Sequence, residues 1–382
     1  MASLACLART KEDLIPQQIT YAFRIECLNV AKVLGMNPYI DLPEAAFWKT
    51  GVAKSDPYAL EGIYKKKFRI RSNAKIATAG SCFAQHISNY LKKNGYSVLD
   101  VEPPPPGLPK ALHQKFGFSM YSARYGNIYS VRQLLQLAQE VAGEWTPQNY
   151  IWEKNGRFYD ALRPSVEPRG FKSPEEVVTH RQFHISKVKK LFQKLDLFIF
   201  TLGLTEMWIH RSSGTVYPTC PGTIVGHYDE KLYEFKNADY DEILADFKRF
   251  KRVMKRIRRG VSFNVLLTVS PVPLTATASG EHVLAATSYS KSTLRSVAGV
   301  LAAKQARIDY FPSFEIVTNP RLCSASFGDN LRSVRPEAVE TVMDHFFAQH
   351  PVILKKGKQS DATNSSKDDV LCEEAILEAF GE

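Results

Sequence analysis

Two runs of apolar residues constrain the fold of this chain more than any other feature of its sequence. Residues 195–204 and 263–269 have the length of a strand and are too apolar for a strand with one face in water. Between them, apolar residues at positions 243, 247, 250, 254 and 257 predict a helix over residues 239–259. Because buried strands that alternate with helices are typical of parallel sheets, we expect an α/β fold with a mostly parallel sheet and helices on both faces.

The same alternation begins upstream of these runs. A short apolar segment arrives at Gly80, a helical stripe follows it, and Asn94-Gly95 ends that stripe. Five further elements are expected from apolar spacing and turn residues: strands over residues 75–80 and 96–101, and helices over residues 81–94, 130–141 and 285–303.

The chain divides by composition into three parts. Residues 1–70 form a leader rich in aromatic residues, which we expect to pack on the domain that follows. Residues 71–350 contain the alternating pattern and predict one α/β domain. Residues 351–382 are polar and predict a mobile tail.

Composition excludes several classes of protein. The 382 residues include 50 Lys and Arg against 39 Asp and Glu, for a net charge of +11, and 44% are hydrophobic. These values are typical of a globular protein, and they exclude disordered and collagenous classes. No apolar run approaches the roughly 18 residues that a membrane-spanning helix needs, and the N-terminus lacks a secretory signal. The six cysteines are scattered, without a CxxC motif, which suits a reducing compartment. We therefore expect a cytoplasmic protein.

The sharpest chemical feature is a serine at a strand-to-helix junction, within Ala79-Gly80-Ser81-Cys82. A serine there lies at the carboxyl edge of a parallel sheet, where such sheets bind ligands, and its amide begins a helix whose field suits an oxyanion. The structural alternative is that Ser81 only caps the helix while Gly80 makes the turn. The motif is not the GxSxG elbow, because Phe83 stands where the second glycine would be.

Three further segments carry polar residues near expected strand ends. They are residues 121–129 with Gly126 and Asn127, residues 200–208 with Gly203, and residues 268–273. All of them lie near carboxyl ends of strands, so they are expected to converge on one cleft with Ser81. Each segment taken alone is also explained by turns and core packing.

These motifs, in this order, resemble the GSCFA family, named after residues 80–84. The resemblance extends to the blocks at residues 124–129, 202–206, 268–272 and 289–295 and covers roughly residues 70–350. That family is similar to the SGNH/GDSL hydrolases, which implies a three-layer α/β/α fold with a flavodoxin-like sheet. In that superfamily an early serine attacks an acyl group, later glycine and asparagine residues stabilise the oxyanion, and a late Asp-x-x-His block supplies the base.

The resemblance assigns roles to individual residues of this chain. Ser81 matches the nucleophile, and its amide matches one oxyanion donor. Gly126 and Gly203 match the glycines of the second and third blocks, and Thr205 takes the place of the asparagine, with a hydroxyl that donates one hydrogen bond. Asn127 and Glu206 are expected to orient these groups or to contact the substrate.

The late block departs from the superfamily pattern. Asp329 matches its aspartate, but Ser333 stands where relatives carry histidine, and a serine is no general base near neutral pH. The substitute that we expect is His282, which follows the loop after residues 268–271 and stands beside Glu281. His86 and His345 are weaker alternatives.

Other chemical signals are weaker. Cys82 is an alternative nucleophile at the same helix start, although its side chain is expected to turn inward. The i, i+4 pair His180 and His184 lacks a third ligand at matching spacing, so we expect a surface face of a helix and no metal site. No phosphate-binding glycine motif is present, and no cofactor is expected.

A basic helix ends near residue 259. Eight Lys and Arg residues lie within residues 248–259. This charge suits an anionic glycan, a phospholipid surface or nucleic acid, whereas the structural alternative is a solvated helix face.

The sequence leads to two hypotheses of different classes. The first is an SGNH-like serine esterase or acyltransferase that acts on an acylated carbohydrate or glycoconjugate. The second is a non-catalytic protein of the same fold that binds a glycan or another anionic partner. The missing late histidine favours the second, and the Ser81 and Gly203–Thr205 blocks favour the first.

Overall fold

The computed structural model describes residues 37–351, 377, 378 and 380. The chain divides into two units, Met1–Ser55 and Asp56–Glu382. In the first unit, the described residues form a 3-10 turn, η1 (Glu44–Ala46), and a short π-helical turn, η2 (Lys49–Ala53).

The second unit begins earlier than residue 71, the start predicted for the domain. The amide of Leu60 donates to Nε2 of His345 at 3.0 Å, and Tyr64 and Ile70 are buried in the core of this unit. Residues 56–70 therefore belong to the α/β unit because they fill its core. The predicted mobile tail falls almost entirely outside the described residues.

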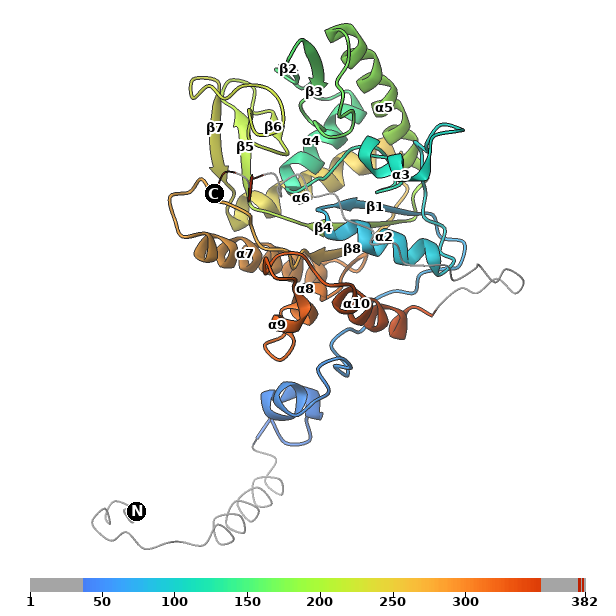
Figure 1. Ribbon diagram of the computed structural model, residues 1–382. Coiled ribbons are helices and arrows are strands. Elements are labelled where there is room, and N and C mark those ends of the chain that lie inside the picture. The colour runs from blue at the N-terminus through green and yellow to red at the C-terminus, as the bar shows by residue number, and fades with distance from the viewer. Residues whose placement is uncertain (1–36, 352–376, 379, 381–382) are drawn as a thin grey trace, which may run out of the picture. The chain divides into compact units, whose positions relative to one another are not determined.

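The centre of the second unit is a parallel sheet, as the sequence predicts (Figure 1). Its strand order is β1-β4-β8-β9, and every neighbouring pair is parallel. The expected strand over residues 96–101 is reduced to one parallel bridge between Val98 and Ile76, on the free side of β1. The strands are β1 (Ile76–Gly80), β4 (Leu197–Leu202), β8 (Asn264–Val269) and β9 (Ile308–Tyr310).

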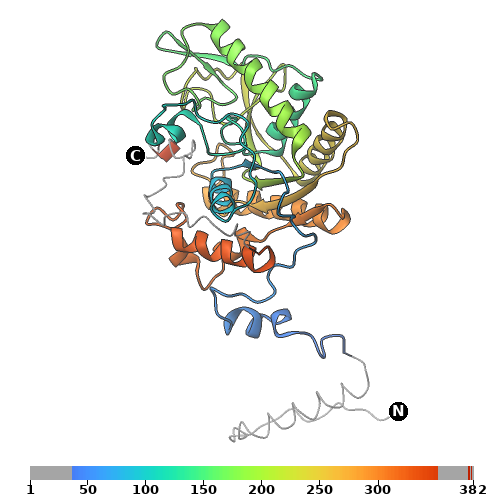
Figure 2. The same ribbon diagram turned by 90° about the vertical axis from the view of Figure 1, so that its right-hand side faces the viewer.

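Helices cover both faces of this sheet (Figures 1 and 2). One core includes Ala77, Phe198 and Leu267 with apolar residues of α4, α5, α6 and α7, and the other includes Ile199 and Leu266 with residues of α2, α8 and α10. Successive strand residues enter opposite cores, which is why the strand sequences are apolar throughout. The α/β prediction is confirmed. The helices are α2 (Phe83–Lys93), α3 (Lys110–His113), α4 (Val131–Ala142), α5 (Pro174–Lys194), α6 (Tyr240–Ile257), α7 (Val283–Lys304), α8 (Ser313–Val317), α9 (Cys323–Ser326) and α10 (Pro336–Gln349), with a 3-10 turn, η3 (Gln114–Phe116).

Two small antiparallel sheets accompany the central one, and the sequence pattern did not indicate them. One is the hairpin β2-β3 and the other has the order β6-β5-β7. Strand β5 begins at Glu206, only three residues after Gly203, so the second small sheet starts at the edge where β4 ends. Their strands are β2 (Ile151–Lys154), β3 (Arg157–Asp160), β5 (Glu206–His210), β6 (Val216–Tyr217) and β7 (Tyr233–Asn237).

The strand order places a switch point between β1 and β4. From β1 the chain crosses to the Val98 side of the sheet, and it later returns to the other side as β4. At such a point the connections leave in opposite directions and open a crevice at the carboxyl ends of the strands. Ser81 follows β1 at this edge, and Gly203 follows β4.

Candidate functional site

Gly80 lets β1 and β4 meet closely at the switch point. Its φ is +140°, and a Cβ built there would lie 2.4 Å from the carbonyl oxygen of Thr201. Only glycine adopts this backbone conformation without strain. The glycine is therefore required by the backbone geometry that presents Ser81.

The Ser81 hydroxyl is buried without a hydrogen-bond partner among the residues that the structure describes. The residue is 3% exposed, and its amide donates to the carbonyl of Thr201 at 3.2 Å. Its carbonyl accepts from the amide of Ala84 at 2.9 Å and from the hydroxyl of Tyr121 at 3.1 Å. Helix α2 is capped by Cys82 without a side-chain bond. The Ser81 hydroxyl thus does not perform the capping role of the structural alternative.

Gly203 lies directly against Ser81. A Cβ on Gly203 would lie 3.0 Å from the Cβ of Ser81 and 3.0 Å from the carbonyl oxygen of Tyr129. The amides of Gly203 and Leu204 both donate to that Tyr129 oxygen, at 3.1 and 3.0 Å. Three of the four predicted segments therefore meet at this point.

The segment with Gly126 and Asn127 is fixed to the end of β1. Gly126 has a φ of +68°, and the amide of Ile128 donates to the carbonyl of Gly80 at 2.9 Å. The Asn127 side chain is buried and accepts a hydrogen bond from Tyr121, which also contacts the Ser81 carbonyl. Asn127 is thus joined to Ser81 through one tyrosine hydroxyl.

Thr205 has another unpartnered hydroxyl near this site. It is 0% exposed, and its Oγ1 has no partner within the described part of the chain. Its amide donates to Oγ of Ser290 in α7 at 3.1 Å. Because the amides of Ser81 and Gly203 are also engaged, neither is available as an oxyanion donor in this structure. Of the predicted donors, Thr205 and Gly126 are left, and their role stays a prediction.

Lys291 also belongs to this site, although no motif in the sequence predicts a role for it. Its side chain is buried, and Nζ donates to the carbonyl of Gly203 at 2.7 Å. Lys291 lies beside Ser290, so consecutive residues of α7 hold the Gly203–Thr205 loop. The only sequence signal was its place in the 289–295 block of the family resemblance.

The predicted base and its aspartate have other partners. His282 is exposed and caps α7, where its Nδ1 accepts from the amide of Leu284 at 3.1 Å. Asp329 projects into solvent, with 3.6 Å to Arg335, and Ser333 is exposed and bonds Asn330 at 3.1 Å. No described contact brings these residues to Ser81. The reason is local: a capping position and a tight surface loop use these side chains where they stand.

Other histidines are also held by partners away from Ser81. His345 accepts from Leu60 through Nε2 and contacts the Thr341 carbonyl through Nδ1, and His350 contacts the Tyr64 hydroxyl at 3.0 Å. Cys82 is buried and forms no disulfide with another described residue. Within the described ranges, no imidazole is hydrogen-bonded to the Ser81 hydroxyl.

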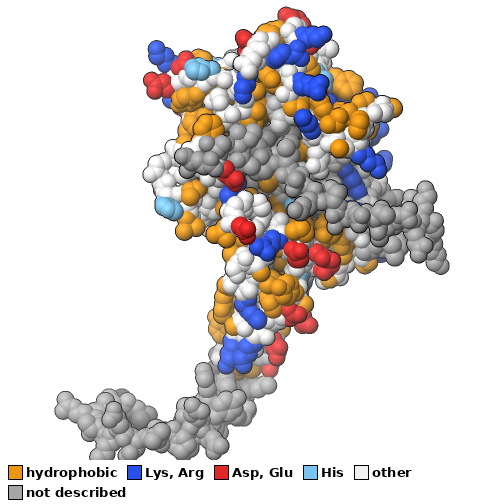
Figure 3. Space-filling view, viewed as in Figure 1, with side chains coloured by type: hydrophobic (Ala, Val, Ile, Leu, Met, Phe, Trp, Pro, Cys, Tyr) orange, Lys and Arg blue, Asp and Glu red, His pale blue; other side chains and the backbone are white. Residues whose placement is uncertain are grey.

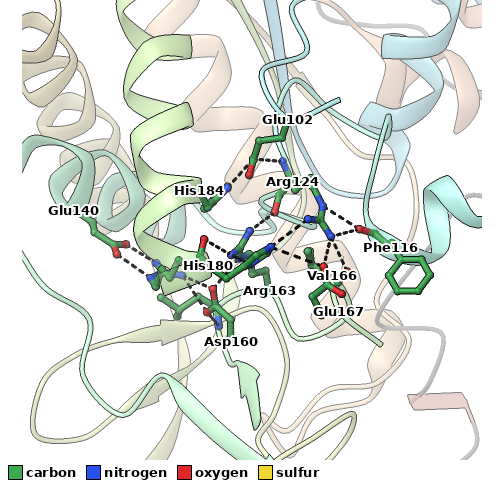
Figure 4. Close-up of polar contacts among 12 residues, drawn as sticks. Glu102, Phe116, Arg124, Glu140, Asp160, Arg163, Val166, Glu167, His180 and His184 are labelled. Atoms are coloured by element: carbon green, nitrogen blue, oxygen red, sulfur yellow. Dashed lines mark hydrogen bonds and ion pairs between the residues drawn. The ribbon is translucent and has the colours of Figure 1, made fainter. Parts of the chain in front are cut away.

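The expected surface pair His180 and His184 contacts polar side chains, and His184 is buried while His180 is half-buried (Figure 4). His184 is 1% exposed, and its Nδ1 lies 2.8 Å from Glu102, while Nδ1 of His180 lies 2.8 Å from Arg163. The surface prediction is wrong for His184, which faces Glu102, whereas His180 keeps 23% of its side chain exposed. They belong to a buried ion network: Glu102, Arg124, Glu140, Asp160, Arg163, Glu167, His180, Arg181 and His184.

Electrostatics set the charge states in this network. Burial alone would raise the pKa of Glu102, yet the charge that His184 carries once protonated, its hydrogen bond and the charge of Arg163 lower it to about 2. Burial, and then Arg163, lower the pKa of His184 to about 4. A neutral His184 therefore donates to an ionised Glu102 at neutral pH. Among the described side chains, no group of His, Cys, Asp and Glu is arranged to hold a metal ion.

Glu206 is half-buried at the start of β5 and faces a cavity. Its Oε1 accepts from the hydroxyl of Thr277 at 2.7 Å, and burial raises the pKa of its carboxyl. The cavity measures about 240 Å³ and is also lined by Leu204, the residue after Gly203. The predicted position of Glu206 near the site thus coincides with a pocket.

The basic stretch at residues 248–259 is only partly a surface. Arg258 is buried and donates to the carbonyl of Phe192, and Arg256 pairs with Glu144 at 2.5 Å. Lys251 lies 4.0 Å from the ring centre of Phe263, and burial, with neighbouring cations, lowers the pKa of its amine to about 8. Figure 3 shows Lys and Arg side chains gathered also over the top of the view, where α5 lies. The anionic partner stays a prediction.

The fold and the buried serine at the switch point define an α/β protein with a flavodoxin-like strand order. A model of the GSCFA family matches residues 75–346, and the chain belongs to the GSCFA family. No curated protein matches the sequence.

One solved structure with weak similarity is that of an acetyl esterase mutant with an acetate ion. The sequence identity is 10%, the match covers 71% of this chain and 93% of that chain, and the TM-score is 0.31. This similarity is too low to define a function. Within the described residues, no helix combines the length and the apolar character needed to cross a bilayer.

Proposed function

We propose that this protein is a serine esterase or O-acyltransferase that acts through Ser81 on an acylated carbohydrate or glycoconjugate. The observation that carries this proposal is the Ser81 hydroxyl, which is buried at the switch point without a partner among the described residues. An unsatisfied buried hydroxyl costs about 1–3 kcal/mol, and a substrate contact would offset this cost. The carbohydrate substrate rests on the resemblance to the SGNH hydrolases.

The chemistry runs through a covalent acyl-serine. Oγ of Ser81 attacks the acyl carbon, its proton passes to a base, and the ester C–O bond breaks. The base returns the proton to the leaving alkoxide, and water or an acceptor hydroxyl then removes the acyl group from Ser81. The oxyanion would accept a hydrogen bond from Thr205, whose buried hydroxyl is otherwise unused by the described residues.

We assign the base to Lys291. Its Nζ bonds the carbonyl of Gly203, and Gly203 contacts Ser81. Serine–lysine pairs perform this chemistry on other folds. Lys291 thereby replaces the histidine that the late block of this chain lacks.

Labelling with a fluorophosphonate probe tests the role of Ser81. The folded wild-type chain should be labelled, Ser81→Ala should not, and Ser292→Ala, an exposed serine of α7, should match the wild type. The labelled peptide, identified by mass spectrometry, should contain Ser81. Labelling that persists in Ser81→Ala would contradict the proposal.

Two variants of Lys291 test its role as the base. Lys291→Met should slow labelling at least about tenfold, and Lys291→Arg should not restore it, because a guanidinium stays protonated. If Lys291 only holds the Gly203 carbonyl, arginine should rescue the rate.

A second candidate is a non-catalytic binding protein of the same fold. It is favoured by the engaged amides of Ser81 and Gly203, which leave two predicted oxyanion donors unavailable. The folded wild type would then resist labelling while it still binds a glycan or an anionic partner. A cytoplasmic location also stays a prediction.

A further inference from the structure

We propose that the cavity beside Glu206 is a binding site for an uncharged sugar ring. This inference rests on the proposed function for the class of ligand, because it places the sugar part of the acylated substrate. The cavity, of about 240 Å³, is lined by residues of the β6-β5-β7 sheet, of the segment before α7 and of the chain end.

The cavity adjoins the Ser81 junction through consecutive residues. Leu204 lines it, and the preceding Gly203 contacts Ser81. Glu206, two residues further, turns its carboxylate to the same cavity. A ligand seated here would therefore lie next to the loop that touches the proposed nucleophile.

Aromatic and apolar side chains form most of the wall. Trp208 is half-buried, with its ring 5.8 Å from that of Phe235, and both line the cavity. Tyr217 lines it as well and is held by its hydroxyl bond to the Asn149 carbonyl at 3.0 Å. Rigid aromatic faces are suited to the apolar C–H face of a sugar ring.

Two polar groups of the wall are left for ligand hydroxyls. The buried hydroxyl of Thr219 lines the cavity and has no partner among the described residues. Glu206 accepts from Thr277 through Oε1, and its Oε2 has no partner in the described part of the chain. A hydroxyl of the ligand can donate to Glu206, and another can satisfy Thr219.

The charge of the wall selects against anions. Among the described residues that line the cavity, Glu206 is the only charged one, and none is Lys, Arg or His. A phosphate, a carboxylate or a uronic acid would meet this carboxylate without a compensating cation. The site therefore fits a neutral, hydroxylated ring. This ligand differs in charge from the anionic partner suggested for residues 248–259.

The C-terminal end of the chain completes the wall. Leu377 and Phe380 line the cavity, and Glu378 between them pairs with Arg332 at 2.6 Å. Arg332 belongs to the late block whose Asp329 and Ser333 face solvent. The full chain is therefore the form of the protein to test.

Binding is measured in the Ser81→Ala background, by ligand-observed NMR and calorimetry, with the methyl glycosides of glucose, galactose and mannose. At least one of the three should bind. The methyl glucuronide, which carries a carboxylate, should bind at least about tenfold more weakly. Because Ser81 is absent, a failure here is separate from a failure of the labelling experiment.

Three variants locate the site. Trp208→Leu should weaken binding at least about tenfold, whereas Trp48→Leu, in the other unit, should not change it. Thr219→Val keeps the side-chain shape and should weaken binding about threefold to tenfold, which preserves the test if the tryptophan variant fails to fold. Glu206→Gln should reduce the difference in binding affinity between the neutral glycoside and the glucuronide.

Two results would overturn the inference. One is the absence of binding by all three neutral glycosides to the folded protein. Binding of octanoate, an apolar chain with a carboxylate, in their place would be the same result. The other is binding that none of Trp208→Leu, Thr219→Val and Glu206→Gln alters.

Discussion

Two buried polar regions lie side by side in this protein and are built in opposite ways. In the ion network, Asp160 accepts from Arg163 at 2.7 Å and from Arg181 at 2.9 Å, and Arg181 also binds Glu140. At the Ser81 junction, the hydroxyls of Ser81 and Thr205 have no partner among the described residues. Asn127 lies near both regions, because it contacts Tyr121 and lines a small cavity beside Arg181.

The difference separates structural from functional polarity. Buried charges are tolerated only when they are paired. We therefore interpret the ion network as a structural element that joins the segments between β1 and β4. Buried hydroxyls left unpaired lower stability and gain from a ligand instead. The comparison therefore predicts that changes in the network reduce stability, while changes at Ser81 reduce activity.

The largest expected effect is in the network. Arg181→Met should lower the free energy of unfolding by about 3–5 kcal/mol, because Asp160 and Glu140 lose a buried cation. Urea unfolding measures this. Arg256→Met, which breaks the exposed pair with Glu144, serves as the control and should cost about 0–1 kcal/mol. Equal costs for the two variants would remove the distinction between the regions.

The next effect concerns the backbone at the junction. Gly80→Ala should destabilise by about 2–3 kcal/mol more than Gly62→Ala, because only the Cβ at residue 80 meets backbone atoms. Both glycines have positive φ, +140° at Gly80 and +71° at Gly62, so the difference combines the collision with Thr201 and the greater backbone strain at residue 80. Thermal unfolding of both variants gives the difference in stability. Similar melting temperatures would show that the β4 backbone shifts at little cost in free energy.

Acid should act on the network before it acts on the junction. The pKa of His184 is lowered to about 4, so the folded state loses stability as pH falls from about 6.5 towards 4, where the unfolded chain binds the proton more readily. The pKa of Glu102 is lowered to about 2, so its contribution is present above about 4.5 and is lost as pH falls towards 2.

Unfolding measured from pH 7 to pH 3 tests this dependence. Glu102→Gln should flatten the curve by about 1–3 kcal/mol between pH 5 and pH 3. Glu61→Gln, at an exposed position, is the control. A Glu102→Gln curve parallel to the wild type would mean that the carboxylate gains nothing from its partners.

The smallest expected effect on stability is at Ser81 itself. Ser81→Ala should change the free energy of unfolding by less than about 1 kcal/mol, or raise it, because it removes an unsatisfied buried hydroxyl. Thr268→Val removes a hydroxyl that bonds Ser313 at 2.5 Å and should destabilise by about 1–3 kcal/mol. A large loss in Ser81→Ala would reveal a structural role and weaken the functional interpretation.

Much of the fold could be predicted because its signals are local. The apolar runs become β4 and β8, the stripe at positions 243–257 becomes α6, and Gly80 ends β1 as expected. The small sheets escaped prediction because strands of two to five residues, such as β6 and β5, leave no clear period. Composition places residues 56–70 in the leader, because the core packing of an irregular segment leaves no pattern in its sequence.

For the site, the sequence predicted that four segments converge, of which three meet at the switch point, and it singled out Ser81, Gly203 and Thr205. Only the tertiary structure decided their partners: the Ser81 amide bonds Thr201, the Gly203 carbonyl takes Lys291, and His282 caps a helix. It also placed Glu206 on a pocket and buried His184 beside Glu102. The physical reason is that periodicity is a property of neighbouring residues, whereas hydrogen-bond partners and burial depend on segments far apart in the chain.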